Sequence, residues 1–308
     1  STPIGLGLLS PDPAWLSCNG SGRQAVLGSR SVSNFKSISV APLSPVIGAE
    51  VTGVDLSKSI GQETFQELHD ALMEHLVLFF RDQDMTLGQH KDFGRLFGKL
   101  HVHPAAPGPE GHPEIINVHA DANSSWVVGE TWHSDVTCDE EPPMGSILHI
   151  HKAPPSGGDT MYANMYRAYE ALSQPVRAML DGLTAVHDSE HTLTVRYGND
   201  GRFRDPEERY PSAIHPIVRT HPVTGRKAIF VNSSYTTVIN GLSKNESDAL
   251  LGMLFRHIAT PEFHCRFSWR PKSVAFWDNR AVQHKAVWDY FPETRSGFRV
   301  TVKGDRPR

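Results

Sequence analysis

Histidine and carboxylate residues separated by one position are the first residues of this sequence that could bind a metal. His133 and Asp135 form such a pair within residues 131–137, whose β-branched and aromatic residues favour the end of a strand. Side chains alternate along a strand, so positions i and i+2 point to the same side. A third ligand from a distant strand would complete the two-histidine, one-carboxylate face that holds non-haem Fe(II) and leaves open coordination positions. Such a face would make the protein an oxygenase.

This spacing alone is a weak signal. The chain contains 17 histidines and 34 acidic residues among 308, so about two such pairs are expected by chance. Four pairs are found, namely His90/Asp92, His112/Glu114, His119/Asp121 and His133/Asp135. The first pair lies in a predicted helix, where positions i and i+2 face different ways, and the second surrounds Pro113 in a predicted loop. The third pair follows a good strand, so the local pattern leaves two candidates.

Length, charge and cysteine content exclude several classes of protein. With 39% hydrophobic residues, 308 residues can bury one large core or two modest ones. The net charge of −4 gives no indication of a nucleic-acid or membrane-surface partner. Cys18, Cys138 and Cys265 form neither a disulfide framework nor a metal-binding pair, which fits a reducing cytosol. No apolar run reaches the roughly 18 residues of a membrane span and no signal-peptide pattern is present, so we expect a cytoplasmic protein.

Short strands separated by a few helices are predicted from Phe35 onward. The predicted strands are residues 37–41, 77–80, 115–118, 145–151, 227–231, 273–277 and 298–302. The predicted helices are residues 62–75, 87–98, 166–172, 175–183 and 244–258. This order predicts a mainly β fold with inserted helices, a β-sandwich or jelly roll. Residues 1–34 are rich in Ser, Gly and Pro and predict a flexible arm, which leaves residues 35–308 as one domain.

The C-terminal region contains a candidate for the third ligand. Residues 277–280 read Trp-Asp-Asn-Arg, His284 follows, and Arg295 and Arg299 lie 11 and 15 residues beyond it. With several motifs in the same order, this region resembles the taurine dioxygenase family of Fe(II)- and 2-oxoglutarate-dependent enzymes. The resemblance covers residues 39–307, and its other motifs are residues 46–56, 101–104, 132–137, 157–160 and 221–227. It implies a double-stranded β-helix, which is a cupin-like jelly roll.

The resemblance also implies roles for residues in the site. It makes His133, Asp135 and His284 the Fe(II) ligands and leaves the pair at His119 without a role. It assigns the far carboxylate of 2-oxoglutarate to Thr160 and Arg295, which suits a guanidinium that binds carboxylate through two parallel hydrogen bonds. By itself Arg295 would be interpreted as a solvent-facing arginine on a C-terminal strand. The implied reaction consumes 2-oxoglutarate and O2, releases succinate and CO2, and hydroxylates the substrate.

Substrate contacts are implied for His103, Arg299 and the backbone at Val136. Tyr235 is either a further lining residue or an ordinary core tyrosine. Two cation-capable groups, His103 and Arg299, favour a small anionic organic substrate, namely a sulfonate, a sulfate ester or a carboxylate. Larger or more polar residues of the family are replaced here by small ones, which predicts a pocket wider and less polar than taurine needs. The replaced positions are Ala106, Gly129 and Cys138.

The expected protein is therefore a dioxygenase acting on an anion larger than taurine, as a homodimer or homotetramer. Within the family, the alternatives are taurine dioxygenase proper and a natural-product biosynthetic oxygenase. Outside it, a jelly-roll binding module or a zinc hydrolase would need no 2-oxoglutarate site. His149 and His151 share one face of a predicted strand and are interpreted as structural. Residues 187–191 predict a charged loop near the mouth of the site.

Overall fold

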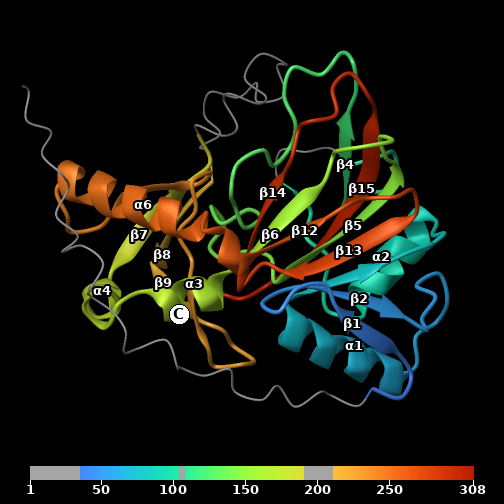
Figure 1. Cartoon of the computed structure of the whole chain (residues 1–308), viewed down its shortest axis with the longest axis horizontal. Coiled ribbons are helices and arrows are strands. Elements are labelled where there is room, and N and C mark those ends of the chain that lie inside the picture. Colours follow the sequence, from blue (N-terminus) through green and yellow to red (C-terminus); the bar gives the residue numbers. More distant parts are fainter. Residues whose placement is uncertain (1–34, 104–107, 191–210) are drawn as a thin grey trace, which may run out of the picture. The chain divides into compact units, whose positions relative to one another are not determined.

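A seven-stranded sheet forms the larger layer of the computed structural model, which describes residues 35–103, 108–190 and 211–308 (Figure 1). Its strand order is β1-β2-β3-β13-β5-β15-β4, and every neighbouring pair is antiparallel except β2 with β3. The bounds are β1 Ser39–Pro42, β2 Ala49–Thr52, β3 Val77–Phe80, β4 Ile115–Ala120, β5 Gly145–Lys152, β13 Ser273–Asp278 and β15 Arg295–Val302. The predicted arm at residues 1–34 and Ala106 lie outside the described residues.

A three-stranded sheet in the order β12-β6-β14 packs against the larger one (Figure 1). Its strands are β6 Thr160–Asn164, β12 His264–Phe267 and β14 Val282–Ala286. Tyr162 and Phe267 from this sheet share one core with Phe79 and Trp277 of the larger sheet. Two sheets around one core confirm the predicted jelly roll.

Two helices cover part of the outer face of the seven-stranded sheet. Helix α1 spans Gln62–His75, and α2 spans Leu87–Arg95 behind the capping box of Thr86 and Gln89. Leu68 and Leu72 of α1 form a second core with Phe80 and Phe276 of the sheet. This core packs against the outer face of β3 and β13. The Trp-Asp-Asn-Arg motif begins at the last two residues of β13.

The remaining elements pack beside the jelly roll (Figure 1). Strands β7 Thr184–Asp188, β8 Ser212–Pro216 and β11 Thr236–Ile239 form one small sheet, and β9 Val218–Thr220 pairs with β10 Lys227–Ile229. The helices here are α3 Met165–Ala171, α4 Gln174–Leu180, α6 Lys244–Ile258 and the 3₁₀ turn η2 Pro261–Phe263. Helix α6 begins at the predicted capping box of Ser243 and Glu246 and buries Leu251, Leu254 and Ile258.

The predicted helices are all present, and α1 and α6 have the predicted bounds. Helices α2 and α4 each end three residues before the predicted end. The charged loop predicted from residue 187 is wrong at its start, because His187 lies in β7 with no exposed surface and stacks on Phe230. His191 lies outside the described residues. None of the described helices combines the length and apolarity of a membrane span.

Candidate metal centre and active site

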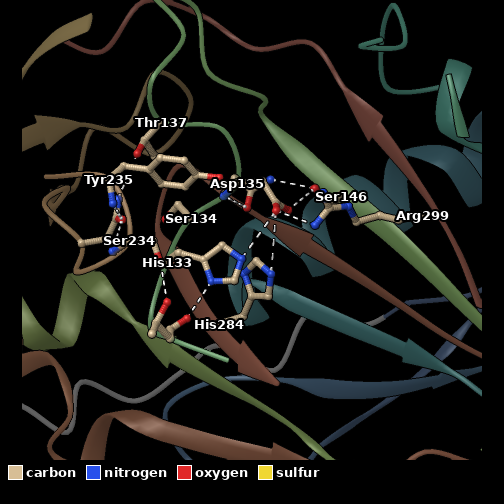
Figure 2. A network of polar contacts seen from close by, with 12 residues as sticks. His133, Ser134, Asp135, Thr137, Ser146, Ser234, Tyr235, His284 and Arg299 are labelled. Carbon is tan, nitrogen blue, oxygen red and sulfur yellow. Dashed lines mark hydrogen bonds and ion pairs between the residues drawn. The ribbon is translucent and has the colours of Figure 1, made fainter. Parts of the chain in front are cut away.

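His133, Asp135 and His284 come together at a contact between two distant parts of the chain. His133 and His284 form an isolated β-bridge, with backbone N–H···O distances of 3.1 and 2.8 Å. Asp135 Oδ1 lies 3.7 Å from His133 Nε2 and 3.9 Å from His284 Nε2 (Figure 2). All three residues are buried, and their possible ligand atoms lie within 4.8 Å of one another. Within the described residues, no other histidine, cysteine or carboxylate residues form such a group.

The backbone around Asp135 differs from the predicted strand end. Only His133 pairs, and the chain then turns, with Asp139 N donating to Val136 O. Val136 has a φ of 49°, a left-handed conformation that is rare for a β-branched residue. The turn, rather than strand alternation, therefore brings the carboxylate of Asp135 to the imidazole of His133.

The protonation states of the three side chains suit metal binding. Thr131 O is only an acceptor, so His133 Nδ1, 2.8 Å away, carries a proton, and Nε2 is the nitrogen that the neutral tautomer would offer to a metal. Burial, followed by the nearby His133, holds the pKa of His284 well below its usual value, so its imidazole is neutral. Burial alone would raise the pKa of Asp135, but the charge of the adjacent Arg299 and the hydrogen bond from Ser146 outweigh it and keep the carboxyl ionised. Two neutral imidazoles and one carboxylate are a donor set that fits Fe(II).

Thr160 and Arg295 lie together at the other end of the same pocket. Arg295 Nη2 donates to Thr160 Oγ1 at 3.2 Å, and Trp269 Nε1 donates to the same oxygen at 2.9 Å. The threonine oxygen therefore accepts two hydrogen bonds, and its own proton remains available to an acceptor in the pocket. Arg295 is 5% exposed and forms no ion pair with a carboxylate of the described residues, and its Nε has no partner there. This combination fits the missing carboxylate of a dicarboxylic acid.

One pocket, with an empty volume of about 370 Å³, joins the two ends. His133 and His284 line it together with Thr160, Arg295 and Arg299. The rest of the lining is largely apolar, consisting of Val118, Val128, Gly129, Leu148, Trp277 and Ala286. The fold thus brings two of the predicted iron ligands, His133 and His284, and the predicted 2-oxoglutarate residues into one cavity.

Arg299 and His103 differ in charge from one another. Arg299 Nη1 lies 2.5 Å from Asp135 Oδ1 in a buried ion pair (Figure 2). Burial, then the nearby Arg299 and His101, lowers the pKa of His103 to about 4. His103 is therefore neutral near pH 7, and its part in holding an anionic substrate stays a prediction. Its imidazole could still offer hydrogen bonds.

Val136, Cys138 and Tyr235 form a small buried cluster beside the metal ligands. The ring of Tyr235 points toward the turn that carries Asp135 (Figure 2). Gly129 has a φ of 83°, and a Cβ there would lie 3.0 Å from Cε1 of His133. The small residues at Gly129 and Cys138 thus lie next to His133 and Tyr235, on the predicted substrate side. Tyr235 packs in this cluster, which is compatible with both of its predicted roles.

The other histidines of the short motif do not form comparable groups in the described residues. His119 and Asp121 pair at 3.4 Å on the surface. His90 is buried and bonds to Ile147 O, whereas Asp92 is exposed and pairs with Arg95. These contacts account for both pairs as structural features.

Three residues near the site have no role predicted from the sequence. Trp269 supports Thr160, as described above. Ser146 donates to Asp135 Oδ2 at 2.7 Å, and Asn279 accepts from Asp135 N at 3.2 Å. Asn279 belongs to the Trp-Asp-Asn-Arg motif, but its partner lies 144 residues away in the sequence. Only the folded chain identifies these contacts.

Comparisons with known proteins agree with this geometry. A family model described as "Taurine catabolism dioxygenase TauD, TfdA family" matches residues 39–301. An alpha-ketoglutarate-dependent dioxygenase of Penicillium expansum, cnsM, is 37% identical over 289 residues, covering 88% of this chain and 79% of that protein. An alpha-ketoglutarate-dependent sulfate ester dioxygenase of Pseudomonas putida is 35% identical over 277 residues, covering 88% and 91%. The crystal structure of a taurine dioxygenase from Burkholderia xenovorans is 40% identical with a TM-score of 0.76, covering 88% of this chain and 91% of that one.

Proposed function

The chain belongs to the TauD, TfdA family of Fe(II)- and 2-oxoglutarate-dependent dioxygenases, and we propose that it hydroxylates a sulfate ester, sulfonate or carboxylate larger than taurine. Fe(II) and 2-oxoglutarate, when bound, supply the oxidising chemistry, in which O2 is consumed, succinate and CO2 are released, and a C–H bond becomes C–OH. The protein contributes the placement of the metal, the cosubstrate and the substrate.

We assign the metal to His133, Asp135 and His284. The Nε2 atoms of the two imidazoles and Oδ1 of the carboxylate face one another, and the bond from His133 Nδ1 to Thr131 O fixes the required tautomer. Three protein ligands would leave half of the coordination sphere open for 2-oxoglutarate and O2.

The single observation that carries the proposal is Arg295, a buried cation with no ion pair to a carboxylate of the described residues, in the same pocket as His133 and His284. Burying Arg295 without an anion costs free energy, and the pocket that it lines also contains His133 and His284. A 2-oxoglutarate carboxylate bound there would accept from the guanidinium of Arg295 and from the hydroxyl of Thr160. Its other end would then be directed toward the metal ligands.

The proposed substrate class rests on charge and space near Asp135. Arg299 supplies one buried positive charge there, which favours an anion, and the neutral His103 and the backbone at Val136 are proposed as hydrogen-bonding partners. Gly129 and Cys138 are small residues that lie next to His133 and Tyr235, where a larger side chain would narrow the site. The Pseudomonas putida relative is a sulfate ester dioxygenase, which supports sulfate esters as candidate substrates. Taurine itself is the competing substrate.

Succinate release across a panel of anions tests both the reaction and the substrate class. The purified protein would be incubated with Fe(II), 2-oxoglutarate and ascorbate, together with taurine, longer alkyl sulfonates, alkyl sulfates or aryloxy carboxylates. We expect the highest kcat/KM for an acid larger than taurine. A preference for taurine would overturn the wide pocket, and the absence of 2-oxoglutarate-dependent succinate with all of these acids would overturn the proposed substrate class.

Two further expectations concern the whole protein. We infer a cytoplasmic location, which is supported by the free, buried thiols of Cys138 and Cys265 because such thiols persist in a reducing compartment. A homodimer or homotetramer remains a prediction, and size-exclusion chromatography with light scattering would test it.

A further inference from the structure

The two oxygens of the Asp135 carboxylate have different surroundings. Oδ1 faces Nε2 of both His133 and His284 and pairs with Arg299. Oδ2 accepts a hydrogen bond of 2.7 Å from Ser146 Oγ. In Figure 2, Ser146 and Arg299 approach the carboxylate from one side and the two imidazoles approach it from another. Oδ1 is thus the oxygen that faces the two imidazoles, whereas Oδ2 is held by Ser146.

The direction of the Ser146 bond is fixed by Asn279. Oδ1 of Asn279 accepts from Trp277 Nε1 at 2.9 Å and from the backbone N of Asp135 at 3.2 Å. Both partners are obligate donors, so the amide oxygen must lie on that side and the NH2 group on the other. That NH2 group donates to Ser146 Oγ at 2.9 Å. The single proton of Ser146 therefore points to Asp135 Oδ2.

These contacts form a closed and buried ring. Asp135 and Asn279 are each 2% exposed, Trp277 is 1% exposed, and Ser146 has no exposed surface. Water does not compete for the bonds at this depth, so each donor has one available partner. Ser146 lies opposite Trp277 in the pairing of β5 with β13, so the central strands of the larger sheet fix the ring in place. The arrangement is built from protein groups alone.

We propose that Ser146 and Asn279 are positioning residues that restrict Asp135 to binding the metal through Oδ1 alone. This inference rests on the metal centre proposed above. If Oδ2 were released, both oxygens could bind the metal, and the second would occupy a position that the cosubstrate or O2 requires. The ring would thus preserve the open half of the coordination sphere.

Substituting Ser146→Ala tests the proposal without relying on turnover. Co(II) would be used as the probe, because its visible absorption reports its coordination number and its binding can be titrated. We expect S146A to bind Co(II) about 10- to 100-fold more weakly than the wild type and with an altered absorption spectrum. S146T keeps the hydroxyl and is expected to restore the wild-type spectrum.

Ser273→Ala is the matched control. Ser273 is equally buried, lies on β13, and its hydroxyl accepts from Arg81 and the backbone of Arg270, away from the site. S273A is expected to leave Co(II) affinity and spectrum unchanged, and near-UV circular dichroism would establish that each variant is folded. An S146A protein that is folded and matches the wild type in Co(II) affinity and spectrum would overturn this inference alone. A wild-type protein that binds no Co(II) would overturn the proposed metal centre together with it.

Discussion

Hydrogen-bonding groups that are not fully paired within the described residues lie at the end of the pocket proposed for the cosubstrate. The guanidinium of Arg295 lies over Trp269, 5.3 Å from the ring centroid, and bonds to Thr160. The cation–π contact and the hydrogen bonds with Thr160 and Tyr290 hold its position, but none of these neutral groups supplies a negative charge. The residue is therefore preorganised for an anion that arrives from solution.

Replacing Arg295 should weaken 2-oxoglutarate binding specifically. Charge-assisted hydrogen bonds contribute roughly 1.5–3 kcal/mol, so R295A is expected to raise the KM for 2-oxoglutarate about 10- to 100-fold. R295K keeps the charge but loses the fork geometry, and its KM should be intermediate. Initial rates of succinate formation against 2-oxoglutarate concentration would measure this, with Arg167→Ala on the surface of α3 as the control. An R295A enzyme with unchanged KM would refute the assignment.

A larger side chain in place of Gly129 should narrow the proposed substrate side of the pocket. A side chain at this position would approach His133, and asparagine tolerates the left-handed φ of 83° better than other residues. We expect G129N to lower kcat/KM for large anions by about tenfold relative to taurine, the scale on which one buried group discriminates substrates. Competition assays with paired substrates would measure the ratio. An equal loss of kcat/KM for small and large acids would instead indicate that the substitution displaces His133.

The sequence predicts the proposed ligand-binding residues better than the residues that support them. The histidines and Asp135 belong to short motifs whose order along the chain resembles a known family. Ser146, by contrast, is one of many serines, and its partners lie 11 and 133 residues away. No local pattern distinguishes such a residue, because its role arises only when β5 pairs with β13.

At the scale of elements, helices were easier to predict than strands. Helix α6 carries both a capping box and apolar residues at helical spacing, and its bounds match the prediction. The strands β6 and β14, which carry Thr160 and His284, were missed. Residues of β6 are nearly all buried, without the alternation that identifies a half-exposed strand. Their strand conformation depends on cross-strand partners more than 100 residues away.

The end of β13 contains a buried ion pair that stabilises the Trp-Asp-Asn-Arg motif. Asp278 has no exposed surface and accepts bonds from Arg280 at 2.8 Å and from His221 at 3.0 Å. Removing its charge would leave Arg280 buried and unpaired. D278N is therefore expected to lower the free energy of unfolding by about 3–5 kcal/mol at pH 7. Urea unfolding followed by circular dichroism would measure it, and Asp248→Asn on the surface of α6 should change little.

The same pair gives a pH dependence with a definite sign. Burial would raise the pKa of Asp278, but Arg280 and His221 outweigh it and hold the pKa below its ordinary value of 3.8. A group with a lowered folded pKa contributes its full stability above the unfolded pKa and loses it as the pH falls. The difference between wild type and D278N should thus be constant from pH 7 to about pH 5 and shrink below about pH 4. A difference that grows on acidification would contradict the assignment.

At the scale of the whole molecule, the site lies where the two sheets meet. The seven-stranded sheet supplies Arg295, Arg299 and Ser146, and the three-stranded sheet supplies Thr160 and His284. Asp135 comes from a turn outside both. A metal held by His133, Asp135 and His284 would link that turn to the smaller sheet, and a cosubstrate held by Thr160 and Arg295 would link the two sheets. Binding energy at the site should therefore stabilise the fold as a whole.

The Tm of the protein should accordingly rise first with the metal and then with 2-oxoglutarate. A ligand at 100 times its Kd adds about 2.7 kcal/mol of stability, which corresponds to a rise in Tm of roughly 5–10 °C for a domain of this size. Mn(II), which avoids turnover, is expected to raise Tm, and 2-oxoglutarate should add a second rise only when Mn(II) is present. EDTA should reverse both.

Two variants are expected to separate the rise in Tm caused by Mn(II) from the rise caused by 2-oxoglutarate, and differential scanning fluorimetry would measure both. D135A should lose both of them, because the cosubstrate binds through the metal, whereas R295A should keep the first and lose most of the second. A second rise that persists in full in R295A would mean that 2-oxoglutarate is held elsewhere. A rise with 2-oxoglutarate in the absence of Mn(II) would mean that the dicarboxylate binds without the metal, and that the two sheets are linked by Arg295 and Thr160 alone.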